Sequence, residues 1–451
     1  MLIRSISGLR GLTDAFDGFT EDTARLYAQS FAEMLGNNGL VSLGFDGRLG
    51  GKVYYELIAE TLIDCGCDVL GLQMAPTPTV MFAVETHSSV KGGISVTASH
   101  NGQEWNGMKF INHSGLFLDK TENEALWKIV DRGSKAFHGA KGEMSPGDKI
   151  KLEHIESILE IPFLKVEAIR DRKFKIILDA VNASGSFIVR ELLDGLGVGS
   201  LDVIPLHADG SGRFPHPPEP LPHNLKELSE AVIKEKADLG IAVDPDADRC
   251  VFIMDNGEPF IEENTIVLAV EEVLRNSGAG QSIVVNLSTT RAIDDIAEKF
   301  GAVVYRTPVG EINVAKKMIA MGSILGGEGS GGVIYPEVHT GRDSLVAIAL
   351  ALNNLATSNT SLSEKRKSLP QYEIVKSKIG LKSAEQTAEV LAAVRQKIAG
   401  EAISINEEDG IRFDFEKSWL HVRASNTEPI IRLIAEAPTR EEAEAILDKV
   451  M

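Results

Sequence analysis

Apolar residues along this chain follow two alternating periods, one typical of helices and one typical of buried strands. Residues 21–36 place apolar side chains at helical spacing directly after two acidic residues, which favour a helix N-terminus. Short apolar runs at 41–45 and 69–72 predict strands, and a helix is predicted between them at 53–63. The chain therefore begins with a β-then-α rhythm.

The same rhythm continues through the middle of the sequence. Further strands are predicted at 173–178, 239–243, 250–254, 282–287 and 303–306, with helices after Gly185, at 262–274, after Thr289 or Thr290, and after Gly310. Strands that alternate with helices indicate α/β units with largely parallel sheets.

The C-terminal part of the chain has a different pattern. Two strand-like runs, at 411–415 and 419–423, flank a short polar turn and predict a hairpin. A third strand is predicted at 430–435. Thr439 and Glu442 then have the spacing of a capping box before a final helix. This part of the chain is expected to form a small α+β domain.

Three polar or Gly/Pro-rich stretches are possible domain boundaries, near 139–148, 255–259 and 357–369. A length of 451 residues suggests about three domains, with two to four allowed. The proline-dense segment 214–222 is interpreted as a rigid loop rather than a linker, because helical spacing resumes at Leu225.

The amino-acid composition excludes some classes of function. Asp and Glu number 65 against 46 Lys and Arg, giving a formal charge of −19, and no dense basic block is present. A nucleic-acid partner is therefore not expected, and an anionic ligand would have to be held by local cations and backbone donors. Three cysteines, an odd number, argue against a disulfide framework and for a reducing compartment. Cys65 and Cys67 are interpreted as small buried residues at a helix end.

The N-terminus lacks the apolar core of a signal peptide, and no apolar run reaches the roughly 18 residues of a membrane span. We therefore expect a cytoplasmic protein without a membrane partner.

A first candidate for chemistry lies in the segment 92–102, where a predicted strand runs into a small polar turn. The turn presents the hydroxyl of Ser99 beside the imidazole of His100, and Lys109 follows in the same local unit. A serine becomes nucleophilic only with help from a base, a metal or a charged acceptor. The alternative interpretation is a polar turn with a hydrogen-bonded histidine.

A second candidate is the run Asp244-Pro245-Asp246-Ala247-Asp248-Arg249, at the end of an apolar strand. Three clustered carboxylates repel one another unless a cation lies among them, and a set of oxygen ligands suits Mg²⁺. An EF-hand is excluded because its loop requires glycine where Arg249 stands. An acidic solvated turn is disfavoured, since apolar strands flank the cluster on both sides.

A third candidate is the glycine-rich segment 326–332, whose backbone can approach a ligand closely. Glu328 and Ser330 remain as its specific contacts. A carboxylate suits sugar hydroxyls better than phosphates, because it would repel an anion. A flexible turn is the alternative.

A fourth candidate follows Arg423, at the end of a predicted strand. Ser425, Asn426 and Thr427 give three small hydrogen-bonding side chains in a row. Together with bidentate contacts from the arginine, they would make a phosphate cradle. The alternative is an Asn/Ser turn.

These four segments, in this order, resemble the α-D-phosphohexomutase superfamily, which includes phosphomannomutase/phosphoglucomutase and phosphoglucosamine mutase. Weaker matches lie at 7–11, 46–48, 76–79, 307–310 and the proline-rich loop ending at 223–225. The resemblance implies an α/β protein of four domains around a central cleft. Three would be α/β domains with mixed sheets and the last a smaller α+β domain, with bounds at 1–145, 146–254, 255–367 and 368–451.

The resemblance also implies a reaction. A phosphoserine enzyme would interconvert hexose 1-phosphate and hexose 6-phosphate through a bisphosphorylated sugar, with Mg²⁺ as cofactor and a sugar 1,6-bisphosphate as activator. The implied catalytic residues are Ser99, His100, Lys109 and Arg249, with either His100 or Lys109 as the acid/base; the metal ligands are Ser99, Asp244, Asp246 and Asp248; the substrate-binding residues are Arg10, Thr307, Gly310, Glu328, Ser330, Arg423, Ser425, Asn426 and Thr427.

Some positions depart from the pattern of particular family members. Gly102 stands where many members have proline, and Glu311 where some bifunctional members have histidine. The glycine-rich loop is closer to those of members assigned to glucosamine or mannose phosphates, so the sugar remains open among glucosamine, mannose and glucose. A metal-dependent sugar phosphatase and a non-catalytic phosphosugar-binding protein are the competing functions. Either a monomer or a homodimer is compatible with the sequence.

Overall fold

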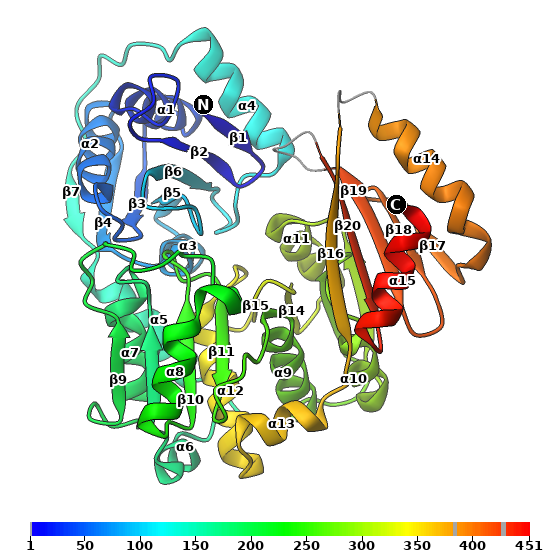
Figure 1. Cartoon of the computed structure of the whole chain (residues 1–451). Coiled ribbons are helices and arrows are strands. Elements are labelled where there is room, and N and C mark those ends of the chain that lie inside the picture. The colour runs from blue at the N-terminus through cyan, green and yellow to red at the C-terminus, as the bar shows by residue number, and fades with distance from the viewer. Residues whose placement is uncertain (1, 382–385, 425–429) are drawn as a thin grey trace.

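The computed structural model describes residues 2–381, 386–424 and 430–451. Within them the chain forms four sheets that follow one another along the sequence, three in α/β domains and the last in a smaller C-terminal domain (Figure 1). Among the described residues, no helix is long and apolar enough to cross a membrane.

The first domain contains a seven-stranded mixed sheet in the order β1-β2-β6-β5-β3-β4-β7. Its strands are β1 (Ile3–Ser5), β2 (Gly8–Leu12), β3 (Leu40–Phe45), β4 (Asp68–Met74), β5 (Val90–Val96), β6 (Trp105–Ile111) and β7 (Met144–Pro146); its helices are α1 (Glu21–Met34), α2 (Gly51–Asp64), α3 (Thr77–Thr86) and α4 (Lys120–Arg132). The parallel pair β3 and β5 lies inside the sheet, and β5 continues into the antiparallel strand β6.

The second and third domains each contain a four-stranded sheet, ordered β11-β10-β8-β9 and β13-β12-β14-β15. The second has β8 (Ile176–Asp179), β9 (Val203–His207), β10 (Leu239–Val243) and β11 (Cys250–Met254), with α5 (Asp148–Leu159), α6 (Val166–Arg172), α7 (Gly185–Gly195) and α8 (Lys226–Glu235). The third has β12 (Ser282–Asn286), β13 (Val303–Thr307), β14 (Leu325–Glu328) and β15 (Gly332–Ile334), with α9 (Glu262–Arg275), α10 (Ala292–Phe300), α11 (Glu311–Met321), α12 (Ser344–Ser358) and α13 (Leu362–Ser368). One apolar core runs through both domains.

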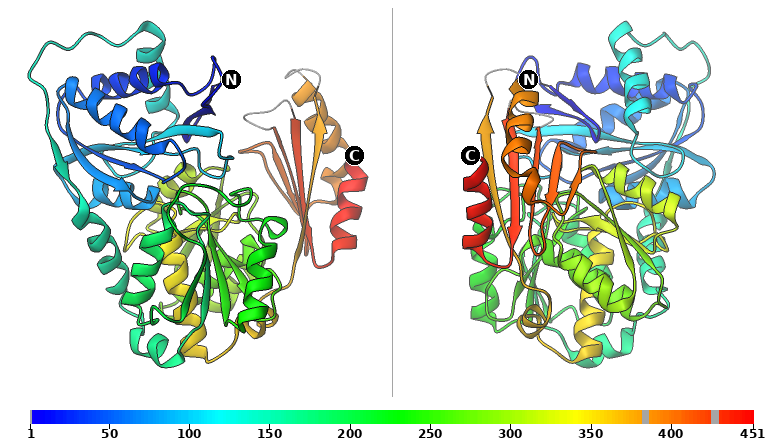
Figure 2. Two further views of the ribbon diagram at one scale, coloured as in Figure 1. Left: turned by 60° about the vertical axis from the view of Figure 1, so that its left-hand side comes forward. Right: turned by 90° about the vertical axis from the view of Figure 1, so that its right-hand side faces the viewer.

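The C-terminal domain contains a five-stranded antiparallel sheet in the order β16-β20-β19-β18-β17. It consists of β16 (Glu373–Gly380), β17 (Ser404–Asn406), β18 (Ile411–Asp414), β19 (Trp419–Ala424) and β20 (Ile430–Ala437), with α14 (Gln386–Ile398) and α15 (Arg440–Val450). Val375 and Ile379 pack against the core beneath these helices. Lys376 and Lys378 alternate with them along β16 and therefore face the opposite side. Figure 2 shows this sheet nearly edge-on beside the other domains.

The structure departs from the predicted pattern at several places. The alternation of strands and helices indicated largely parallel sheets, whereas the sheets of the first three domains are mixed, as the resemblance implied: β6, β11 and β15 each pair antiparallel with a neighbour. Residues 255–259, a predicted domain boundary, form a tight turn after β11, with the Met254 amide donating to the Glu258 carbonyl.

The stretch 357–369 is partly helical, since α13 begins in it after a capping box between Ser361 and Glu364. At the last helix only half of the expected box is seen: the Thr439 hydroxyl accepts from the Glu442 amide.

Candidate active site

Ser99 lies in the turn between β5 and β6, and its backbone conformation is unusual. Its φ of 50° is in the left-handed region, which non-glycine residues rarely adopt, and its side chain is buried at 7% exposure. The Thr97 hydroxyl oxygen accepts from the Ser99 amide at 2.7 Å, and Arg48 Nη2 donates to the Ser99 carbonyl at 2.6 Å. Both backbone polar groups of the serine are thus held, which sustains the strained conformation.

Asp46 accepts hydrogen bonds from Thr97 and Arg48, the two residues that hold the backbone of Ser99. Its Oδ2 accepts from the Thr97 hydroxyl at 2.6 Å and from Arg48 Nε at 2.8 Å. All three side chains are buried. The segment 46–48, one of the weaker matches to the family in the sequence, therefore supports the serine turn through Asp46 and Arg48.

The three aspartates of the second candidate segment lie between β10 and β11 and are fully buried. Their carboxylate oxygens lie within 4.8 Å of one another. The Ser99 hydroxyl reaches the same cluster and donates to Asp244 Oδ2 at 3.4 Å. The structure thus brings together the serine and the three carboxylates that the sequence singled out.

One oxygen of Asp246 and one of Asp248 are anchored by hydrogen bonds, and the other oxygen of each accepts none from the described residues, although Asp248 Oδ1 lies 3.7 Å from Arg249 Nε. Thr77 and Lys109 both donate to Asp246 Oδ2 at 2.6 Å, and Lys109 donates to Asp248 Oδ2 at 2.8 Å. The buried Oδ1 atoms of Asp246 and Asp248 have no hydrogen-bond partner in the described part of the chain. Buried polar atoms normally have a hydrogen-bond partner or bind an ion, so these two oxygens are candidate ligands of a bound group.

The concentration of negative charge in the cluster also favours the binding of a cation. Burial, together with the charges of Asp248 and Asp246, holds the pKa of Asp244 well above its usual value. A divalent cation among the carboxylates would remove this penalty. The donor set contains oxygen atoms only, so it fits Mg²⁺.

Lys109 and His100 differ in charge state. Burial disfavours the ammonium of Lys109, but contacts with Asp246 and Asp248 outweigh it and raise its pKa above the usual value. The charge of Arg249, with burial and Arg10, lowers the pKa of His100 to about 2. His100 Nδ1 lies 3.3 Å from the Ser99 hydroxyl oxygen. At neutral pH a cationic lysine and a neutral imidazole therefore flank the serine.

Ser99 opens into a cavity of about 190 Å³, the serine cavity, which is lined by four cationic side chains. These are Arg10, Lys109, Arg249 and Arg342. The buried Nε atoms of Arg10 and Arg249 have no hydrogen-bond partner among the described residues. Four cations around a serine, two of them with unused donors, favour a dianionic phosphoryl group on its oxygen.

Glu328, at the end of β14, is held by donors on both of its oxygens. Asn286 Nδ2 donates to Oε1 at 2.8 Å and the Gly310 amide at 3.1 Å, while Arg342 Nη1 donates to Oε2 at 2.8 Å. Ser330 lines the same cleft as Glu328. Thr307 lies elsewhere: its hydroxyl donates to the Pro308 carbonyl and it lines a separate cavity.

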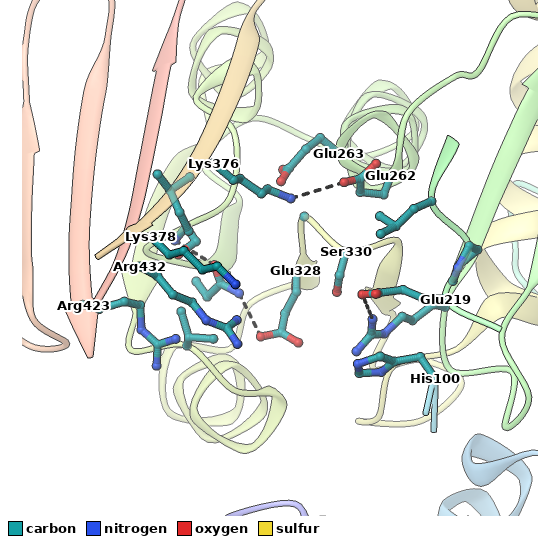
Figure 3. A pocket seen from close by; sticks show the side chains of 18 of the residues that line it. His100, Glu219, Glu262, Glu263, Glu328, Ser330, Lys376, Lys378, Arg423 and Arg432 are labelled. Carbon is teal, nitrogen blue, oxygen red and sulfur yellow. Dashed lines mark hydrogen bonds and ion pairs between the residues drawn. The ribbon is translucent and has the colours of Figure 1, made fainter. Parts of the chain in front are cut away.

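The serine turn, the glycine-rich loop and the C-terminal sheet all line one cleft of about 620 Å³ (Figure 3). Acidic and cationic side chains line it from different elements. Glu219, Glu262 and Glu263 lie on one side, while Lys378, Arg423 and Arg432 approach from the C-terminal sheet. These last three are in register across β16, β20 and β19, and we refer to them as the cation row.

Arg423 is held at the end of β19 by Asp409, whose Oδ2 accepts from Arg423 Nε at 2.9 Å and from the Val309 amide at 3.0 Å. This carboxylate connects the C-terminal domain to the loop before α11. Ser425, Asn426 and Thr427 lie outside the described residues.

Several residues of the site had no clear signal in the sequence. Arg342, Asn286, Asp409, Lys378 and Arg432 belong to this group, whereas Glu311 stood out only as a departure from the histidine of some family members. Arg342 lies just before an apolar helix, where polar residues normally indicate a helix cap, and Asp343 does form that cap. Only the fold shows that the neighbouring arginine points into the site.

Comparison with known protein families gives four matches in order along the chain. The phosphoglucomutase/phosphomannomutase descriptions match as follows: alpha/beta/alpha domain I at 2–137, domain II at 152–257, domain III at 262–372, and the C-terminal domain at 375–451.

Individual relatives agree with these matches. A phosphoglucomutase/phosphomannomutase of Thermococcus kodakarensis is 36% identical over 98% of this chain and 96% of its own length. A probable phosphoglucosamine mutase of Methanopyrus kandleri is 31% identical over 98% of this chain and 95% of its own. The crystal structure of a phosphoglucomutase/phosphomannomutase family protein from Burkholderia thailandensis superposes with a TM-score of 0.85 at 25% identity, covering 100% of this chain and 96% of that one.

Proposed function

Because the chain belongs to the phosphoglucomutase/phosphomannomutase family, and is thus a phosphohexomutase for glucosamine, mannose or glucose phosphates, we propose that Ser99 carries its phosphoryl group. The observation that carries this proposal is the contact between the Ser99 hydroxyl and the carboxylate cluster, at 3.4 Å from Asp244. A buried serine beside three carboxylates and four cations suits phosphoryl transfer.

Asp244, Asp246 and Asp248 would hold Mg²⁺ together with an oxygen of the modified Ser99. When bound, the ion neutralises charge on the phosphoryl group as it moves. Lys109 and Arg249 act beside it as charge stabilisers, because both line the serine cavity and the Lys109 ammonium keeps its proton at neutral pH. Arg10 donates to Asn101 at 2.7 Å and presents its remaining donors to the same cavity.

His100 is the group that we assign to proton transfer at Ser99. Its imidazole is neutral at the pH of the reaction, and Nδ1 lies 3.3 Å from the hydroxyl oxygen. This geometry would let it accept the serine proton when the hydroxyl form of the enzyme is rephosphorylated. Arg249 and Arg10 lower its pKa, and phosphate groups bound in the cleft would counter these charges and make the imidazole more basic. Lys109 is the less suitable base, since its pKa is raised rather than lowered.

The cleft beyond the serine would hold the sugar. Glu328 and Ser330 would bind the sugar hydroxyls, and the Gly310 amide positions Glu328. Arg423, with Ser425, Asn426 and Thr427, would hold the phosphate that is not being transferred. A sugar 1,6-bisphosphate would form in the cleft, turn over, and return its other phosphate to Ser99. Thr307 would support the loop through its hydrogen bond to Pro308 rather than contact the sugar.

We also propose the cytoplasm as the site of action and a monomer or homodimer as the working form; light scattering on the purified protein would decide between the two. The domain bounds 1–145, 146–254, 255–367 and 368–451 are kept as proposals. Each segment contains one of the four sheets, except that Pro146, the last residue of β7, falls in the second segment.

A coupled mutase assay tests the assignment of Ser99. Wild type and Ser99→Ala are supplied with Mg²⁺, a sugar 1,6-bisphosphate and the 1-phosphates of glucose, mannose and glucosamine in turn. We expect the wild type to form 6-phosphates and Ser99→Ala to lose at least about 1,000-fold in kcat, which corresponds to about 4 kcal/mol of barrier. The sugar phosphate with the highest kcat/KM is the preferred substrate. Release of inorganic phosphate without isomerisation would contradict the proposal and favour a phosphatase.

A further inference from the structure

Arg342 is a buried arginine that contacts three loops of the site. It lies between β15 and α12 and is 8% exposed. Each carboxylate that it contacts comes from a different functional segment: Asp248 from the carboxylate cluster, Glu328 from the glycine-rich loop, and Glu311 from the start of α11.

The three contacts use three different nitrogens of the guanidinium. Nη2 donates to Asp248 Oδ2 at 2.7 Å, Nη1 to Glu328 Oε2 at 2.8 Å, and Nε to Glu311 Oε2 at 2.9 Å. The planar fork fixes the angles between these donors, so the positions of Asp248 and Glu328 depend on each other. An ammonium group on a flexible stem cannot reproduce this geometry.

The backbone around Arg342 is also anchored. Its amide donates to Glu311 Oε1 at 3.0 Å, and the next residue, Asp343, caps α12 by accepting from the Leu345 amide at 2.8 Å. Gly332 leaves room for the side chain, because a Cβ there would lie 2.3 Å from the Arg342 Cδ atom. The guanidinium therefore has one well-defined position.

We propose that Arg342 is a positioning residue that couples the metal ligand Asp248 to the sugar-binding Glu328. A cation held by Asp248 would orient this carboxylate, and Arg342 would transmit that orientation to Glu328 through its contacts with both. The sugar is thus bound best when the cation is in place. This inference depends on the roles of Asp248 and Glu328 under the proposed function.

The test measures sugar phosphate binding with and without a cation. Calorimetry gives the affinity of glucose 1-phosphate for Ser99→Ala, which cannot turn over, in the absence and the presence of Mn²⁺. The ratio of the two affinities is the coupling factor. We expect a factor of at least about 5 in this parent and below about 2 when Arg342→Lys is added. An equal coupling factor in the Ser99→Ala parent and in the variant that also carries Arg342→Lys would overturn the inference.

Asn286→Ala is the matched control. It removes the other side-chain donor to Glu328 but leaves Asp248 and Arg342 in contact. Sugar affinity should fall while the coupling factor keeps its parental value. A factor lost equally in Asn286→Ala and Arg342→Lys would show that any disturbance of Glu328 abolishes coupling, which contradicts a specific role for Arg342.

Steady-state kinetics distinguish this inference from the proposed function. In the Ser99 enzyme, Arg342→Lys should raise KM by about tenfold and lower kcat, without rescue by the retained charge. An inactive wild type would refute the proposed function, whereas an active wild type with unchanged Arg342→Lys kinetics would refute only the inference. If Arg342→Lys does not fold, Glu328→Gln tests the same contact, since the neutral amide weakens the pair with Arg342; an unchanged coupling factor would again refute it.

Discussion

The Ser99 hydroxyl donates to the Asp244 carboxylate at 3.4 Å, although 145 positions separate the two residues along the chain. This distance is long for an O–H···O hydrogen bond, so the contact is weak. It can be exchanged at little cost for contacts to a cation and a phosphoryl group. The site is thus built before its ligands arrive, with the reacting oxygen already beside the charges that it needs.

Removal of the Thr97 hydroxyl should reduce both stability and rate. Thr97→Val preserves the shape of the side chain, but it leaves the buried Ser99 amide without its acceptor and removes one of the two donors to Asp46 Oδ2. We expect a loss of about 1–3 kcal/mol in the free energy of unfolding, measured with urea. The turnover number should fall as well, because the left-handed turn of Ser99 loses a support.

Thr97→Ser is the matched control for this change, because it retains the hydroxyl and removes one methyl group. It should keep most of the rate and stability. Equal losses in Thr97→Ser and Thr97→Val would show that packing, rather than the hydrogen bonds, matters at this position.

Asp244→Asn should stabilise the metal-free protein and abolish stabilisation by Mg²⁺. Burial and the neighbouring carboxylates raise the pKa of Asp244 above its unfolded value, so its contribution to stability is largest at low pH and is lost as pH rises. At pH 8 without metal, the variant should melt at a higher temperature than the wild type. With excess Mg²⁺ the order should reverse, because only the wild type gains from binding. A parallel gain in both proteins would exclude Asp244 as a ligand.

Glu263 should make the stability of the protein depend on pH. Burial raises its pKa from about 4.5 to about 8. The folded pKa is above the unfolded one, so stability is fully present below about pH 4.5 and is lost as pH rises through 8. Glu263→Gln removes this dependence. In chemical unfolding, the free energy of unfolding of the variant minus that of the wild type should rise by at least about 1 kcal/mol between pH 5 and pH 9. A constant difference across this range would contradict the raised pKa.

The cation row should contribute to substrate capture. Like charges side by side on a sheet repel, and an anion in the cleft relieves the repulsion. Lys378→Met should therefore raise KM for the sugar phosphate by about threefold to tenfold and weaken its dependence on salt, with less effect on kcat.

Lys449→Met gives the corresponding control for Lys378. It removes the same charge from α15, which packs on the other face of the same sheet. Its KM should equal that of the wild type. An equal rise of KM in both variants would mean that the net charge of the domain, and not the row, attracts the substrate.

Much of the fold could be predicted from the sequence where one face or both faces of an element are buried. Strands β10 and β11 have the predicted bounds, and α9 differs by one residue, because apolar side chains fill these segments. The long helix α12 was not predicted: it is buried on nearly all sides, so it lacks the polar face that reveals a helical period. Strand β15 was also missed, since it has only three residues and pairs in a hairpin with the glycine-rich strand β14.

The site was predictable in part. Ser99 and the three aspartates lie in two local segments that could each be recognised in the sequence, although only the fold brings the two segments together. Arg342 could not be found in this way, because its importance comes only from partners that other loops provide. Its contact with Asp248 spans 94 positions and its contact with Glu328 spans 14.

The position of Arg342 in the chain also bears on how the enzyme is made. Ser99 and the carboxylate cluster leave the ribosome well before residue 342 does, at an elongation rate of roughly 5–20 residues per second. Until then Asp248 and Glu328 lack their shared cation, and the cleft lacks the strands that carry the cation row. A nascent chain that already contains the serine and the aspartates is therefore not yet a competent catalyst, and it cannot consume phosphosugars before the strands that carry the cation row have been synthesised.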